Sequence, residues 1–172
     1  MVNPFQSRTD AKSIYARINL QEITSRPERG SADDFERAHE ESCLFHIVGT
    51  KDAFLQEINE AYKLGVPVRR VNEETLSRKL KQQGFVSPAL AEIKGLESNE
   101  DSWLAIAIEL RNHGTHRSHI PRKFDVGGEE NGRVVFQNPL TGTYMEETIS
   151  EFLTTCLHNM TALLQKLRAT LP

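Results

Sequence analysis

The most restrictive feature of the sequence is an apolar stripe near its C-terminal end. Apolar residues recur there at every third or fourth position over several helical turns: Ile149, Phe152, Leu153, Cys156, Leu157, Met160, Leu163, Leu164, Leu167 and Leu171. This period is typical of an α-helix that places one face in a hydrophobic core. Such a helix needs packing partners, so the rest of the chain has to supply a core. We assign the stripe to packing and not to a cofactor site.

Further segments combine helical spacing of apolar residues with helix-ending residues. They are Thr9–Thr24, Ser31–Leu64, Glu73–Gln83, a short helix that begins at Pro88, and Asn99–His113. Asn72 and Gly84 are suitable caps for the third segment, and Ser87 is suitable for the fourth. Ser98 and Asp101 have capping-box spacing ahead of the fifth. Gly114 is expected to end that helix.

A small β-hairpin is predicted before the last helix. The strand-type residues of Arg133–Gln137 and Thr143–Glu146 flank a turn that contains Pro139 and Gly142. Thr143 with Glu146 could instead cap the last helix. We therefore predict one all-α domain over residues 1–172, an up-and-down bundle of four or more helices. Residues 1–30 would form an N-terminal helix and a break, and residues 120–146 a loop and hairpin insertion.

Composition limits the kinds of partner. The 24 acidic residues outnumber the 21 basic ones, giving a net charge of −3, so no global positive field favours nucleic acid and we predict no binding of DNA. Any polyanion would have to be held by a local patch. Cys43 and Cys156 show neither CxxC nor metal-ligand spacing, which is typical of a reducing compartment. No apolar run is long enough for a leader or a membrane span, so we expect a soluble, cytoplasmic protein.

Chemically useful side chains gather in Trp103–Arg122, where an apolar helical segment is followed by Arg-Asn-His-Gly-Thr-His. An imidazole can take up and release a proton near neutral pH. A guanidinium is always charged and offers a planar fork of donors to phosphate oxygens. Arg111 and His116 could therefore promote attack of a ribose 2′-hydroxyl on the adjacent phosphorus without a metal or another cofactor. Asn112 could orient the imidazole or bind a phosphate oxygen.

The segment Arg111–His116 resembles the Rx4–6H motif of the HEPN superfamily, in its form with four intervening residues and a polar residue after the arginine. The resemblance implies a helical bundle that acts as a metal-independent endoribonuclease and leaves a 2′,3′-cyclic phosphate. It also implies a homodimer in which Arg111 and His116 of two subunits meet. Such proteins commonly act as toxins or in defence against phage, and an antitoxin or a nucleotidyltransferase would be the partner.

Several alternatives remain open. Arg111 could be a cation that caps the end of its helix, and His116 an exposed loop residue, in a non-catalytic interaction or nucleotide-binding module. His113, His116 and His119 could bind a metal, although Gly114 and the nearby proline argue against one continuous helical face. The remaining basic residues of the segment are candidates for binding the phosphates of a substrate. The candidate substrate-binding residues are His113, Arg117, His119, Arg122 and Lys123.

Overall fold

The computed structural model describes residues 4–25, 34–117, 119–125 and 132–172. The side chains of Pro4, His116 and Arg117 lie outside this description. The elements, in chain order, are α1 (Pro4–Thr24), α2 (Asp34–Ala61), the 3-10 turn η1 (Val68–Arg70), α3 (Glu73–Gln83), α4 (Pro88–Ser98), α5 (Trp103–Asn112), the π-helical turn η2 (His113–Arg117), β1 (Arg122–Phe124), β2 (Val134–Phe136) and α6 (Ile149–Arg168).

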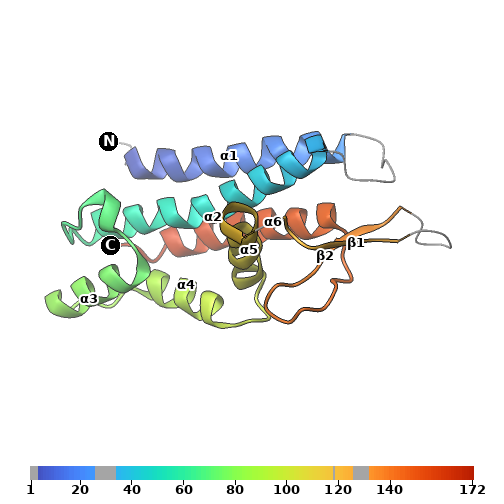
Figure 1. Cartoon of the computed structure of the whole chain (residues 1–172). Coiled ribbons are helices and arrows are strands. Elements are labelled where there is room, and N and C mark those ends of the chain that lie inside the picture. Colours follow the sequence, from blue (N-terminus) through green and yellow to red (C-terminus); the bar gives the residue numbers. More distant parts are fainter. Residues whose placement is uncertain (1–3, 26–33, 118, 126–131) are drawn as a thin grey trace.

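The predicted all-α bundle with a small hairpin before its last helix is confirmed. Figure 1 shows α1 and α2 as an antiparallel pair with α6 beside α2, while α3 and α4 lie on the side away from α1. The strands β1 and β2 lie at the end of the bundle opposite both chain termini. None of the helices within the described ranges is long and apolar enough to cross a bilayer.

The centre of the molecule is α2. It packs against α1 on one side and against α5 and α6 on the other, and its buried residues include Leu44, Ile47, Phe54 and Ile58. A helix buried on several sides needs apolar residues around most of its circumference. The stripe of α6 completes the core, and its predicted packing role is confirmed by the burial of its members from Ile149 to Leu167.

An ion-pair cluster joins the three long helices. The guanidinium of Arg168 on α6 donates to both carboxylate oxygens of Glu57 on α2, at 3.0 and 2.8 Å, and lies 2.8 Å from Asp10 on α1. The Glu57 side chain is only 4% exposed, so the guanidinium takes the place of water as its hydrogen-bond donor. The hydrogen bonds with Glu57 raise the pKa of Arg168 above its ordinary value. The cluster therefore fixes how α1, α2 and α6 meet.

Local capping signals located both ends of α3 correctly and the start of α5 incorrectly. Asn72 caps α3 by accepting a hydrogen bond from the Thr75 N–H at 2.8 Å, and Gly84 ends it with a φ of 73°. For α5, the predicted start at Ser98 was wrong. Ser102 is the N-cap, because its hydroxyl accepts from the Ala105 N–H at 3.1 Å, whereas the Ser98 hydroxyl donates to a carbonyl within α4.

A full capping box begins α6. Thr148 Oγ1 accepts from the Glu151 N–H, and the Glu151 carboxylate accepts from the Thr148 N–H at 2.8 Å. Replacing Thr148 by alanine should lower the free energy of unfolding by about 1 kcal/mol, or about 2–4 °C in Tm, because a helix-end N–H loses its acceptor. Thermal unfolding followed by circular dichroism measures the change. Thr154→Ala is the control, since that exposed hydroxyl donates to a carbonyl within α6, and an equal loss in both variants would contradict the capping role.

The hairpin exists, but its strands pair differently from the prediction. β2 pairs antiparallel with β1, with Lys123 opposite Val135, and the expected strand Thr143–Glu146 is absent from this described part of the chain. The predicted turn does form, since Gly142 N–H donates to the Asn138 carbonyl and Gln137 faces Tyr144 in a single bridge. Val135 and Phe136 of β2 are buried, whereas β1 is largely exposed and places the Arg122 guanidinium carbon 5.8 Å from the centroid of the Phe136 ring.

Candidate active site

The segment that carries the Arg-Asn-His-Gly-Thr-His motif changes its helical type. The α-helix α5 ends at Asn112, and the chain continues through Gly114 as the π-helical turn η2. Gly114 therefore does not terminate the helix, contrary to the prediction. The backbone N–H of His113 donates to the Glu109 and Leu110 carbonyls, so the α-helical bond to the residue four positions back is still made at His113, where η2 begins. Single π-helical turns are rare and occur frequently at functional sites.

The wider turn alters the relation between Arg111 and His116. In a continuous α-helix, residues five positions apart lie about 140° from each other around the axis. A π-helical turn contains more residues, because its hydrogen bonds span five residues instead of four. The backbone at His116 therefore lies nearer the face of Arg111 than an α-helix would place it. The His116 side chain lies outside the described residues.

Arg111 is half-buried in the last turn of α5. Its carbonyl oxygen accepts a hydrogen bond from Thr115 Oγ1 at 2.9 Å, which ties the motif turn to the helix. Its Nε is buried and has no hydrogen-bond partner among the described residues, and none of their carboxylates pairs with the guanidinium. An arginine that only capped its helix would donate to the last carbonyls. Within the described residues, this half-buried guanidinium has no acceptor.

The neighbouring polar side chains are only partly engaged. Asn112 Nδ2 donates to Glu109 Oε1 at 3.2 Å, so the amide group is held by its own helix. The half-buried ring of His113 has an Nδ1 that is buried and without a hydrogen-bond partner in the part of the chain that the structure describes. A buried ring nitrogen without a partner is energetically unfavourable. His113 Nδ1 shares this state with Arg111 Nε in the same turn, and with Arg37 Nε, His46 Nδ1 and Gln56 Oε1 elsewhere in the described residues.

The motif turn packs against α2. A Cβ added to Gly114 would lie 3.5 Å from the carboxyl carbon of Glu41 and 3.5 Å from Cδ1 of Ile120. The Glu41 carboxyl group therefore borders the turn from a helix that is far away in the sequence. No sequence signal identified Glu41, because its place at the site depends on how α2 crosses α5.

Replacing Gly114 by alanine should leave Tm unchanged or raise it by a few degrees. A methyl group at 3.5 Å from its neighbours is in ordinary contact, and glycine inside a helix costs about 0.5–1 kcal/mol relative to alanine. Thermal unfolding of Gly114→Ala tests this, with Gly95→Ala as the matched control, because Gly95 lies in α4 with open space around it. A clear loss of stability in Gly114→Ala alone would contradict the packing described for the turn.

Arg122, a candidate phosphate-binding residue, has a structural partner. Its Nη1 donates to Glu40 Oε2 of α2 at 2.8 Å, and its guanidinium carbon lies 5.8 Å from the centroid of the Phe136 ring. Burial raises the pKa of the Glu40 carboxyl above its ordinary value, and the charge of Arg122 acts in the opposite direction. Because Arg122 neutralises a buried carboxylate, we leave it out of the proposed site. The sequence could not show this pairing across 82 positions.

The other basic candidates differ in their surroundings. Lys123 Nζ lies 2.6 Å from Asp125 Oδ1, and half of its side chain is exposed. His119 is exposed and follows the motif turn, while Arg117 is the last residue of η2 and its side chain lies outside the described residues. For these three residues, substrate binding stays a prediction. Metal binding has no described support, since no three His, Cys, Asp or Glu residues in the described ranges are grouped so as to hold an ion.

Comparisons with protein-family models, with curated proteins and with solved structures find no match to this chain. The functional argument therefore rests on the residues of the motif turn and on their surroundings.

Proposed function

We propose that the motif turn at the end of α5 is the active site of a metal-independent endoribonuclease of the HEPN type. The observation that carries the proposal is Arg111. Its guanidinium is half-buried, has no acceptor among the described residues, and immediately precedes a π-helical turn that contains His116. A half-buried cation without a partner among the described residues is suited to an anionic ligand. A phosphodiester is the anion for which an arginine can bind the oxygens while a histidine transfers a proton.

The proposed reaction is an internal transesterification. The ribose 2′-oxygen attacks the adjacent phosphorus, its proton passes to a base, and the bond from phosphorus to the 5′-oxygen breaks. The products are a 2′,3′-cyclic phosphate and a 5′-hydroxyl that has gained a proton. In this proposal His116 transfers one of these protons. Arg111 stabilises the negative charge that develops on the phosphoryl oxygens in the transition state.

Dimerisation is a separate proposal, because the resemblance places the Arg111 and His116 residues of two subunits close together. It is tested by measuring the mass of the purified protein in solution by light scattering. A dimer mass is expected, and a monomer that cleaves RNA would contradict the shared site. The toxin or defence role, and a protein partner such as an antitoxin, are proposals that co-expression and growth assays would test.

The direct experiment is cleavage of total RNA by the wild-type chain and by His116→Ala, each with and without EDTA. We expect cleavage by the wild type alone, and no inhibition by EDTA. Inhibition by EDTA would favour the metal alternative through the histidines. Absence of cleavage by wild-type protein would favour the non-catalytic binding module.

A further inference from the structure

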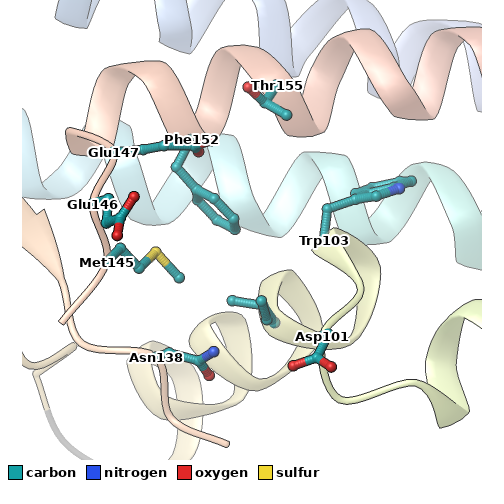
Figure 2. Close-up of a pocket in the computed structure, with 9 residues that line it drawn as sticks. Asp101, Trp103, Asn138, Met145, Glu146, Glu147, Phe152 and Thr155 are labelled. Carbon is teal, nitrogen blue, oxygen red and sulfur yellow. The ribbon is translucent and has the colours of Figure 1, made fainter. Parts of the chain in front are cut away.

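A hollow lies at the N-terminal end of α5, away from the motif turn, where α5, α6 and the chain leading into α6 meet. It has a volume of about 310 Å³ and is lined by Asp101, Trp103, Ile106, Asn138, Met145, Glu146, Glu147, Phe152 and Thr155. Figure 2 shows the Phe152 ring reaching into the hollow between Met145 and Trp103. This volume is at the lower end of the range for small-molecule sites.

The walls of the hollow are apolar and its rim is acidic. Trp103, Ile106, Met145 and Phe152 form the walls. Asp101, Glu146 and Glu147 are exposed at the rim, and none of these three carboxylates forms an ion pair with another described residue. No lining residue is basic. The hollow therefore combines aromatic rings and a thioether with uncompensated negative charge.

We propose that this hollow binds a small organic cation, that is, an ammonium group carried on a compact apolar body. The faces of aromatic rings attract cations, most strongly in the case of tryptophan. The rim carboxylates add attraction for the positive charge, and the apolar walls cover the attached carbon atoms. The indole of Trp103 and the three carboxylates therefore offer a cation two sources of attraction in one hollow.

Other ligand classes fit less well. A bare metal ion needs several oxygen ligands that converge on one point, and the described residues contain no group of three acidic, His or Cys residues able to hold one. An anion would be repelled by the rim. A neutral apolar molecule would use the walls but gain nothing from the carboxylates. The proposal does not depend on RNA cleavage, because the motif turn follows the last turn of α5 and the hollow borders its first.

The chain contains a single tryptophan, Trp103, which lines this hollow and also a neighbouring one, so the rim variants are what assign a change in its fluorescence to this hollow. The experiment titrates the full chain with choline, and separately with its uncharged carbon isostere, in which a tert-butyl group replaces the trimethylammonium. We expect a saturable change with choline, with a Kd on the order of 1 mM, and binding of the isostere at least about tenfold weaker. Added salt should weaken choline binding, because the rim charges are exposed.

The variants test the origin of the attraction. Asp101→Asn, Glu146→Gln and Glu147→Gln combined should weaken choline binding by about tenfold without unfolding the chain, since all three side chains are exposed. Glu60→Gln, an exposed glutamate on α2 outside the hollow, should leave it unchanged. Equal affinity for choline and the isostere, unchanged binding by the triple variant, or no saturable signal would each overturn the proposal.

Discussion

Replacing His116 by alanine is expected to lower the rate of RNA cleavage by about 10²- to 10⁴-fold, because the variant loses a proton-transferring group. Arg111→Ala is expected to cost about 10²- to 10³-fold through the loss of charge stabilisation in the transition state. The double variant should lose much less than the product of the two factors, because residues that act together are not additive. Initial rates on a fluorescent oligoribonucleotide measure all three effects.

Stability measurements and a surface control separate a catalytic loss from misfolding. Both alanine variants should keep a Tm near that of the wild type, since Arg111 has no protein partner among the described residues. Arg78→Ala is the matched control, because Arg78 is an exposed arginine on α3, away from the motif. Its rate should match that of the wild type. Cleavage that persists in both site variants would remove Arg111 and His116 from the mechanism.

Replacing Arg168 by methionine is expected to lower the free energy of unfolding by about 3 kcal/mol, or roughly 10 °C in Tm. The change leaves the buried carboxylate of Glu57 without its two hydrogen bonds and also removes the pairing with Asp10. The cost comes mainly from the uncompensated buried charge, since methionine keeps much of the apolar packing. Chemical and thermal unfolding measure it.

Lys166→Met is the control on the same helix. Lys166 pairs with Glu92 at 2.7 Å, but its side chain is 65% exposed, and exposed pairs contribute less than about 1 kcal/mol. A small effect in this variant with a large one in Arg168→Met would show that burial decides the value of the ion pair. Equal effects in the two variants would contradict the role of the ion-pair cluster that joins α1, α2 and α6.

The sequence predicted those parts of the fold that depend on local chemistry. The ends of α3 at Asn72 and Gly84 were predictable because each cap is made by residues next to the helix. The start of α5 was not, because Ser98 and Ser102 both look like N-caps and only the packing of α4 decides between them. The partner of β2 was missed for a similar reason. The sequence of Arg122–Phe124 is typical of a basic loop, and its pairing with Val134–Phe136 is visible only in the folded chain.

The candidate site was predictable as a list of residues but not as an arrangement. The motif could be read directly from the chain. The π-helical form of η2, the approach of Glu41 and the pairing of Arg122 with Glu40 depend on how α2 crosses α5, and no local pattern encodes that crossing. The acidic rim of the hollow beside Trp103 was missed because Asp101 and Glu146 are far apart in the sequence and border one hollow only in the folded chain.

The central claim is that the motif turn promotes attack by a ribose 2′-hydroxyl. The most direct measurement compares two oligoribonucleotides, one natural and one with a 2′-deoxy sugar at the mapped cleavage position, with EDTA present and with analysis of the product ends by mass spectrometry. The account predicts a 2′,3′-cyclic phosphate from the natural strand and no cleavage at the deoxy position. Cleavage at the deoxy position, or a linear phosphate formed without a cyclic precursor, would contradict it.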